Sequence, residues 1–306
     1  MEKPLDGLIQ QIAHVILGKE DKIRLSICCL LARGHLLIED LPGVGKTTLA
    51  HTIAKTIGLD YQRIQFTSDL LPSDILGVSI YNRETSDFRF HPGPIFANLI
   101  LADEINRATP KAQSALLEAM EERQVTVEGE TRPLPEPFFV IATQNPSVQI
   151  GTFPLPESQL DRFLMRLHLG YPDARAERAL LSGEDPRQLL LQMKAQMQPS
   201  QFIQLQAAVK KIQLSAPLLD YLQAIINQSR LTPSFQCGLS PRAGLGIVQC
   251  AKAWAFMEGR TFVIPEDIKA ILPATMLHRV LPMQEIVRQQ DFDALMHSFL
   301  QTIPIP

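Results

Sequence analysis

The segment HLLIEDLPGVGKTTLA, residues 35–50, joins an apolar run, a glycine-rich turn and the start of a helix. The run 35–39 has the length of a buried strand, and Gly58 ends the helix that follows the turn. Glycines let backbone N–H groups approach a ligand closely, and a helix N-terminus favours negative charge. The segment therefore predicts a phosphate-binding loop. Its residues are Gly43, Val44, Gly45, Lys46, Thr47 and Thr48.

Two residues of this loop have predicted roles: Lys46 reaches the outer phosphates, and the Thr47 hydroxyl holds Mg²⁺. The strict pattern G-x-x-x-x-G-K-[ST] would begin with glycine at position 40, where this chain has Asp40. We expect the Asp40 carboxylate to point away from the phosphates, because the remaining glycines and Lys46 still form the cradle. The alternative is a plain strand-to-helix turn with an exposed lysine, which the strand and helix context disfavours.

An acidic pair, Asp103-Glu104, follows a second apolar run, ANLILA at 97–102. Parallel sheets bind ligands beyond the carboxyl ends of their strands, so this pair is predicted to lie beside the loop. Asp103 is expected to contact Mg²⁺ through its water shell, and Glu104 to orient and polarise an attacking water. Alone, the pair would only end a strand; together with the Lys46 turn it indicates phosphoryl transfer.

Asn145 follows a third apolar run, FFVIAT at 138–143. An amide at the end of a central strand can position water beside a γ-phosphate. Taken by itself, Asn-Pro predicts only a turn.

The remaining pattern divides the chain into two parts. Candidate strands at 61–66 and 162–169 and helices at 20–32 and 111–122 alternate with the runs above, which indicates a parallel sheet covered on both faces. Beyond residue 172 the pattern is mostly helical, with predicted helices at 174–182, 187–196, 201–213, 215–228, 242–259, 265–272 and 284–300. The sequence thus favours an α/β domain followed by a helical one.

Composition excludes several classes of protein. The 306 residues carry 29 Lys plus Arg and 32 Asp plus Glu, a net charge of −3, and 45% are apolar, which argues against a disordered chain or a nucleic-acid coat. No apolar run reaches the roughly 20 residues of a membrane helix, and the N-terminus has no signal core, so the predicted compartment is the cytoplasm. The four cysteines (Cys28, Cys29, Cys237 and Cys250) lack metal-site spacing and are expected to be structural thiols.

The segments DEINRATPKAQSALLEAMEERQVTVEGETRPLPEPFFVIATQNP (103–146) and GTFPLPESQLDRFLMR (151–166) resemble the MoxR family of AAA+ ATPases. The resemblance runs from VILGKE at 15–20 to LSPRAGLGIVQCAKAWAFMEGR at 239–260. It implies an α/β fold: a P-loop AAA+ αβα core with a parallel sheet at 1–185, then a small all-helical lid at 186–306.

The resemblance also implies residue roles at the predicted phosphate site. Lys46 and Thr47 match the Walker A pair, and Asp103 and Glu104 match Walker B. Asn145 matches the sensor-1 position. Together they imply an ATP hydrolase that uses Mg²⁺.

Two arginines that follow Asn145 along the chain also match functional positions of the family. Arg162, in LDRF, resembles an arginine finger for a neighbouring subunit's γ-phosphate, with Arg166 a second candidate. Arg242, in SPRA, resembles the sensor-2 arginine of the lid. A guanidinium is a permanently charged fork suited to phosphate, but an ion pair of Arg162 with Asp161 or Glu157, and a plain helix N-terminus for Arg242, are the alternatives.

Further expectations concern partners. Members of the family are typically oligomeric, usually hexameric, with ATP between subunits. They are chaperone-like remodellers, often with partners that carry a von Willebrand factor A domain. Gly18 lies in the segment that borders the adenine, residues 68–94 resemble the helix-2 insert, and 124–137 resemble the hairpin before sensor 1.

The sequence is compatible with three functions. The first is an Mg²⁺-dependent ATPase that remodels a protein client, and the second is a slowly hydrolysing scaffold whose output is nucleotide-gated assembly. The third is a nucleic-acid motor, but the predicted hairpin carries Glu128 and Glu130 against Arg132 alone. Phosphates would require basic side chains there, so nucleic acid is the least favoured partner.

Overall fold

The centre of the molecule is a five-stranded parallel sheet with the strand order β2-β5-β8-β1-β9. The computed structural model describes residues 5–84, 86–145, 151–183, 186–233, 235, 237–280 and 289–304. The strands are β1 (Leu36–Glu39), β2 (Tyr61–Gln65), β5 (Leu99–Asp103), β8 (Phe139–Gln144) and β9 (Met165–Leu167). Because all five are parallel, their carboxyl ends meet at one edge of the sheet and their amino ends at the other.

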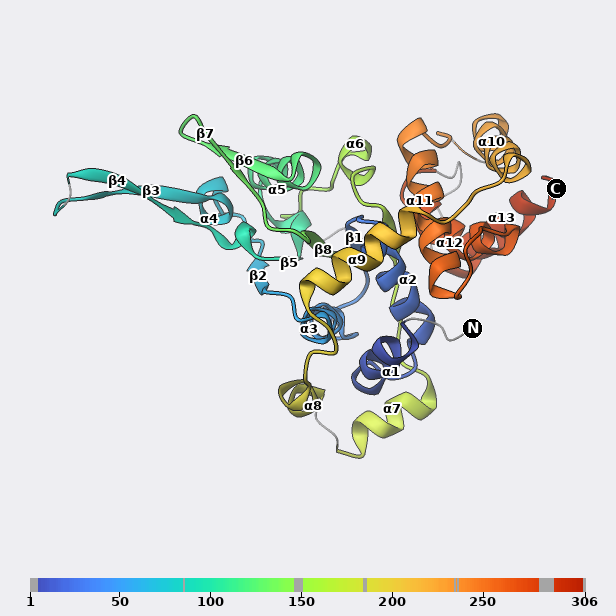
Figure 1. Cartoon of the computed structure of the whole chain (residues 1–306), viewed down its shortest axis with the longest axis horizontal. Helices are drawn as coiled ribbons and strands as arrows, with labels where there is room; N and C mark the ends of the chain where they lie inside the picture. Colours follow the sequence, from blue (N-terminus) through green and yellow to red (C-terminus); the bar gives the residue numbers. More distant parts are fainter. Residues whose placement is uncertain are drawn as a thin grey trace.

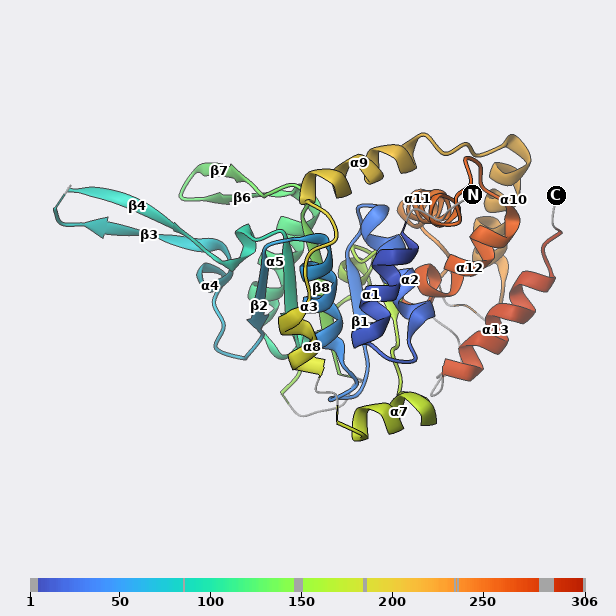
Figure 2. The same cartoon turned by 60° about the horizontal axis from the view of Figure 1, so that its bottom comes forward.

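Helices cover both faces of this sheet, as Figures 1 and 2 show. Along β5, Leu99 and Leu101 belong to one apolar layer, and Ile100 and Ala102 belong to the other. This two-sided burial is why the strands read as continuous apolar runs. The first layer contains α1 (Asp6–Val15), α2 (Glu20–Leu31), α3 (Lys46–Ile57) and α9 (Pro199–Lys210), and the second contains α4 (Pro72–Leu76) and α5 (Pro110–Glu122).

Two hairpins extend from the same end of the sheet (Figure 1). The longer joins β3 (Gly77–Asn82) to β4 (Asp87–Pro92), and the shorter joins β6 (Gln124–Val127) to β7 (Glu130–Pro133). The two are in contact, since the Arg132 guanidinium lies 3.9 Å from the centre of the Phe90 ring. Both lie where the sequence predicts short strands around polar turns.

The second half of the chain is helical, which confirms the predicted fold class. It contains α7 (Ala174–Leu181), α8 (Pro186–Gln192), α10 (Ala216–Leu231), α11 (Pro241–Met257), α12 (Pro265–Met276) and α13 (Gln289–Gln301). Helix α11 packs on α2 and α12, and α12 packs on β9, the edge strand. The division at residues 185 and 186 stays a prediction.

Three predicted elements differ in extent. The strand predicted at 162–169 is reduced to β9, because the backbone of Arg162 and Phe163 bonds back to Gln159 and Leu160 in a turn after α6 (Glu157–Leu160). The helix predicted at 187–196 ends at Gln192, and the following chain crosses α3, where Gln196 N–H donates to Thr56 O at 2.8 Å. The first residues of the helix predicted at 284–300 lie outside the described ranges. In the described part of the chain, no helix is long and apolar enough to cross a membrane.

His35 joins three elements at the amino edge of the sheet. Its Nδ1 accepts from the Val140 N–H at 2.9 Å, so Nε2 carries the proton and donates to the Met120 carbonyl at 3.2 Å. Burial, and secondarily the nearby Arg123, lower the pKa of His35 to about 4. The folded protein therefore holds this ring neutral at neutral pH.

We predict that acid weakens the fold through His35. Below pH 6.5 the unfolded chain protonates this ring, whereas the folded protein keeps it neutral until about pH 4. The free energy of unfolding therefore falls as the pH drops through this window, by about 1.4 kcal/mol per pH unit and about 3 kcal/mol in all. Urea unfolding across the window should show a shallower slope for His35→Asn, which cannot titrate. Burial also lowers the pKa of His278, which leaves part of the slope in both proteins, but identical slopes would contradict the prediction.

Candidate active site

A pocket of about 270 Å³ lies at the carboxyl edge of the sheet. Its walls come from the loop after β1, the first turn of α3, and the ends of β5 and β8. The lining residues are Pro42, Gly43, Gly45, Lys46, Thr47, Thr48, Asp103, Glu104 and Asn145. The structure thus brings together the predicted loop, the acidic pair and Asn145, which lie far apart in the sequence.

The loop adopts a backbone that favours glycine. Gly43 and Gly45 have φ angles of 85° and 96°, in the left-handed region, and a Cβ built on either meets nothing within 4 Å. Gly45 is the N-cap of α3 and supplies no side-chain cap, so the helix start faces the pocket with its first N–H groups. Positive potential at a helix N-terminus, open space and a nearby ammonium are what a phosphate chain requires.

Two hydrogen bonds fix the Lys46 ammonium in the wall of this pocket. Its Nζ donates to Asn145 Oδ1 at 3.0 Å and to the Asp40 carbonyl oxygen. Burial lowers the pKa of Lys46, and the carboxylates of Asp40, Asp103 and Glu104 oppose that shift. The ammonium is therefore desolvated and fixed, which increases its attraction for an anion.

Asp40, the residue that departs from the glycine pattern, turns its side chain away from the pocket. Its Oδ1 accepts from the Leu41 N–H at 2.8 Å, and its Oδ2 accepts from the Gly170 N–H. The carboxylate thus ties the loop after β1 to the chain after β9. Its orientation agrees with the expectation from the sequence.

The acidic pair is fixed by neighbours on both sides of β5. Asp103 Oδ1 accepts from the Thr143 hydroxyl, and Asp103 Oδ2 accepts from Arg63 Nε at 3.0 Å. Glu104 has a left-handed backbone, with φ 56° and ψ 48°, and its N–H donates to Thr143 Oγ1 at 2.9 Å. Thr143 is fully buried, so one hydroxyl sets the positions of both carboxylates.

The Glu104 carboxylate has three partners. Oε1 accepts from Asn145 Nδ2 at 3.0 Å, while Oε2 accepts from Gln65 Nε2 at 3.0 Å and from Arg107 at 2.9 Å. Asn145 therefore links the carboxylate to the Lys46 ammonium through its two amide atoms. This chain of hydrogen bonds holds the Glu104 carboxylate and the Lys46 ammonium on the two sides of one amide.

The donors present suit Mg²⁺ rather than a metal held by the protein alone. The described residues contain no cluster of three or more His, Cys, Asp or Glu side chains that could hold a metal. The Thr47 hydroxyl and the Asp103 carboxylate line the same pocket. Mg²⁺ in proteins is commonly bound by one or two protein oxygens, and water and phosphate oxygens complete its coordination shell.

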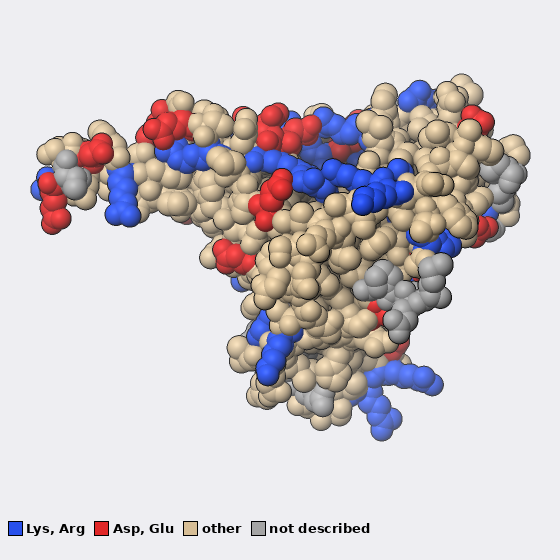
Figure 3. All heavy atoms as spheres, in the orientation of Figure 1, with Lys and Arg blue, Asp and Glu red and all other residues tan. Residues whose placement is uncertain are grey.

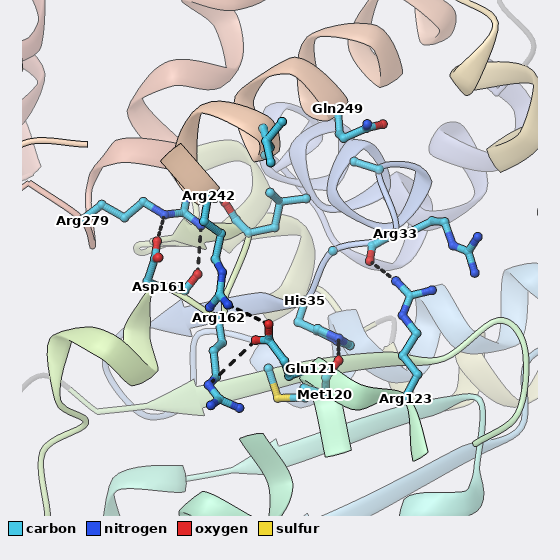
Figure 4. Close-up of a pocket in the computed structure, with 15 residues that line it drawn as sticks. Arg33, His35, Met120, Glu121, Arg123, Asp161, Arg162, Arg242, Gln249 and Arg279 are labelled. Carbon is cyan, nitrogen blue, oxygen red and sulfur yellow. Dashed lines mark hydrogen bonds and ion pairs between the residues drawn. The ribbon is translucent and has the colours of Figure 1, made fainter. Parts of the chain in front are cut away.

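The two predicted catalytic arginines lie elsewhere. Arg162 and Arg242 line a second pocket of about 290 Å³, shown in Figure 4, with Gly34, His35 and Leu164 at the amino edge of the sheet. Arg162 precedes β9 and Lys46 follows β1, and these neighbouring strands are parallel, so the two pockets open at opposite edges. The alternative pairing of Arg162 with Asp161 or Glu157 is not observed. Arg162 donates instead to the Leu117 carbonyl at 2.6 Å.

Two other sequence candidates have separate surroundings. Arg166, the second finger candidate, is paired with Glu39 at 2.6 Å, and the side chains are 19% and 15% exposed, which indicates an internal role. Gly18, with φ 69°, lies against α7, where an added Cβ would be 3.0 Å from Ala176 Cβ and 3.3 Å from Asp173 Oδ2.

The sequence does not reveal the residues that hold the acidic pair in place: Thr143, Arg63, Gln65 and Arg107. Arg63 and Gln65 could have been noticed, because they lie two residues apart on β2 and so share one side of the strand that pairs with β5. The register places Gln65 beside Asp103. Without the strand order, however, nothing identifies β5 as the neighbour of β2.

Comparisons with known proteins agree with this geometry. A family model described as "ATPase family associated with various cellular activities (AAA)" matches residues 35–165, and one described as "AAA lid domain" matches residues 227–297. The chain is 37% identical to Chaperone MoxR1 of Mycobacterium tuberculosis, over 99% of this chain and 82% of that protein. It is 32% identical to Protein MoxR of Methylorubrum extorquens, over 97% and 94%.

Two further relatives cover almost the whole chain. The Bacillus subtilis protein YeaC, which is uncharacterised, is 45% identical over 99% of this chain and 95% of its own length. A crystal structure of a Cytophaga hutchinsonii protein with a provisional ATPase designation superposes with a TM-score of 0.87 at 35% identity, covering 99% of this chain and 94% of that one. The sheet core and the helical part of the chain are therefore both shared with these relatives.

We predict that the hydroxyl group of Thr143 contributes more to the free energy of unfolding than its methyl group does. In Thr143→Val, the buried Asp103 carboxylate loses a donor and the Glu104 N–H loses its acceptor, so the free energy of unfolding should fall by about 1–3 kcal/mol. Thr143→Ser keeps the hydroxyl and loses a buried methyl, which costs about 0.8 kcal/mol. Denaturant titration of the three proteins checks this order, which a loss in Ser equal to or larger than that in Val would contradict.

Proposed function

The chain belongs to the MoxR family of AAA+ ATPases, and from this premise we propose that it binds ATP with Mg²⁺ around Lys46 and hydrolyses it. One observation carries the proposal: Lys46, Thr47, Asp103, Glu104 and Asn145 line a single pocket. The glycine loop and the start of α3 are complementary to a phosphate chain in shape and charge. Family membership supports an ATPase, and the roles of these individual residues are our proposal.

Each residue has a defined task in this proposal. Lys46 binds the outer phosphates, Thr47 and Asp103 would hold Mg²⁺, and the ion would neutralise phosphate charge when bound. Glu104 orients the attacking water and takes up its proton. Asn145 holds Glu104 and Lys46 in register, since its amide bonds both. The phosphate chain competes for Lys46, so its arrival would release one side of Asn145.

We further propose that the active assembly is a ring, expected to be hexameric. Arg162 and Arg242 line a pocket at the edge of the sheet opposite the pocket of Lys46, which supports a role toward the nucleotide of a neighbouring copy. A guanidinium pair at a subunit boundary would stabilise the charge that develops on the γ-phosphate. One chain alone would then lack part of its own catalytic machinery.

Client remodelling is the proposed output. The β3–β4 and β6–β7 hairpins extend from the core and are joined by the Arg132–Phe90 contact, so movement of one would be transmitted to the other. The longer hairpin exposes Val78, Ile80, Tyr81 and Phe88, which is a surface suited to a protein client. A partner with a von Willebrand factor A domain is the adaptor we expect from the family resemblance.

A second candidate function, a nucleotide-gated scaffold with slow turnover, is favoured by the state of Glu104. Its carboxylate is occupied by Gln65, Arg107 and Asn145, and so would need rearrangement to reach water. Assembly on ATP with negligible hydrolysis, even with a partner present, would support the scaffold. A nucleic-acid motor is less favoured, because Arg132 is bound to Glu130 and Phe90 rather than presented to phosphates.

We predict that Glu104→Gln binds ATP as the wild type does and loses turnover. The amide keeps the size of the side chain but cannot accept a proton, so phosphate release should fall by roughly 10²- to 10⁴-fold. Isothermal titration and a phosphate-release assay on the same preparation separate the two effects. Turnover at the wild-type rate would remove Glu104 from this role.

We predict that Arg162→Ala loses the turnover that depends on assembly. Wild-type specific activity should rise with protein concentration as ATP–Mg²⁺ drives formation of a ring-sized particle, whereas the variant should lose roughly 10³-fold or more. Light scattering and phosphate release at low and high concentration test both statements. Arg178→Ala, which removes an exposed arginine of α7, is the matched control. A wild-type monomer whose turnover per chain is independent of concentration would overturn the arrangement.

A further inference from the structure

Glu121, in the last turn of α5, lies between Arg162 and Arg242 in the amino-edge pocket. Its Oε1 accepts from Arg242 at 2.7 Å, and its Oε2 lies 3.9 Å from Arg162 Nε (Figure 4). Arg162 belongs to the core and Arg242 to the second residue of α11 in the lid. One carboxylate therefore bridges the sheet domain and the helical domain at the point where both guanidiniums converge.

The position of Glu121 is unfavourable for the helix that carries it. The C-terminal turn of a helix is its negative end, so an acidic side chain there is repelled by the helix dipole. Two guanidiniums at close range would likewise repel each other without an intervening anion. Glu121 reduces the repulsion between the two guanidiniums, although the helix dipole disfavours a carboxylate at this position. The residue therefore serves the arginine pair rather than the helix.

Folding does not account for this contact. The side chains of Arg242 and Glu121 are 52% and 33% exposed, and ion pairs of this kind contribute little to stability. Deeper contacts already fix the lid at this point. Asp161 binds the nearly buried Arg279 at 2.6 Å and accepts from Ser240, the N-cap of α11, at 3.2 Å. Asp161 thus sets where α11 begins, and Glu121 sets where the guanidinium of Arg242 points.

The pocket is open and basic around this carboxylate. Arg33 and Arg123 line it as well, and Figure 3 shows Lys and Arg side chains gathered across the face between the β6–β7 hairpin and α11. Arg33 is paired with Glu136, and Arg123 donates to the Arg33 carbonyl. Arg162 and Arg242 are the arginines of this pocket that share a carboxylate.

We propose that Glu121 is a positioning residue for hydrolysis in the neighbouring subunit, holding Arg242 against Arg162 so that both guanidiniums meet one γ-phosphate. The proposal rests on the proposed function, since it needs the two arginines to act on another copy's ATP. Glu121 itself touches no substrate. Its removal would leave the subunit's own nucleotide pocket intact, because that pocket opens at the opposite edge of the sheet.

Mixed assemblies test the role of Glu121. Alone, Glu121→Gln should lower kcat by roughly 10- to 100-fold, as expected for misplaced catalytic groups, with an unchanged KM for ATP and an unchanged unfolding midpoint. Mixed with Lys46→Ala, which keeps an intact amino edge but a defective loop, Glu121→Gln chains should regain activity. Mixed with Arg162→Ala, which is defective at the same edge, they should not. Glu122→Gln, one residue along the same helix end, is the matched control and should behave as wild type.

The design separates two kinds of failure. Arg162→Ala mixed with Lys46→Ala tests the shared active site itself, and no recovery there would overturn the proposed function together with this inference. Recovery there, but none for Glu121→Gln with Lys46→Ala, would overturn the role of Glu121 alone. A Glu121→Gln protein with wild-type kcat would do the same.

Discussion

The parallel direction of the five strands is the constraint on which the molecule depends. It gathers the carboxyl ends of β1, β5 and β8 at one edge, where the loop of Lys46, the acidic pair and Asn145 meet in one pocket. The same geometry places the residues that precede the strands at the other edge, including Arg162 before β9. Two chemically different faces thus follow from one topological property, and neither face can be complete within one chain if both serve the same phosphate.

Buried ion pairs and hydrogen bonds, rather than the apolar core alone, fix the geometry at each edge. At the carboxyl edge, the buried hydroxyl of Thr143 joins Asp103 to the Glu104 backbone. At the amino edge, Asp161 holds Arg279, whose side chain is 4% exposed. Removing one partner of such a pair leaves the other desolvated and unpaired, so these contacts resist independent change. The lid is consequently tied to the core just beside the arginines whose orientation matters.

The sequence predicts the fold class and the contents of the pocket at the carboxyl edge because both depend on local pattern. Gly43, Gly45 and Lys46 lie within four consecutive residues, and the acidic pair and Asn145 each come shortly after an apolar run. What the sequence does not predict depends on strand order. Gln65 and Glu121 are ordinary polar residues until β2 is placed beside β5, and α5 beside the lid. The shortening of the strand at 162–169 has a local cause instead, since the backbone N–H groups of Arg162 and Phe163 donate back to Gln159 and Leu160 in a turn.

Asp40 shows how a departure from a motif can be read physically. A carboxylate in place of the first glycine would be harmful if it faced the phosphates, yet its oxygens accept from the N–H groups of Leu41 and Gly170. Its charge still opposes the loss of the proton from Lys46, whose pKa burial lowers. The residue therefore favours the charged form of Lys46, as the other nearby carboxylates do, while its own oxygens tie the loop to the chain after β9. In place of the first glycine of the pattern, the chain thus has a side chain that stabilises the loop by hydrogen bonds outside the pocket.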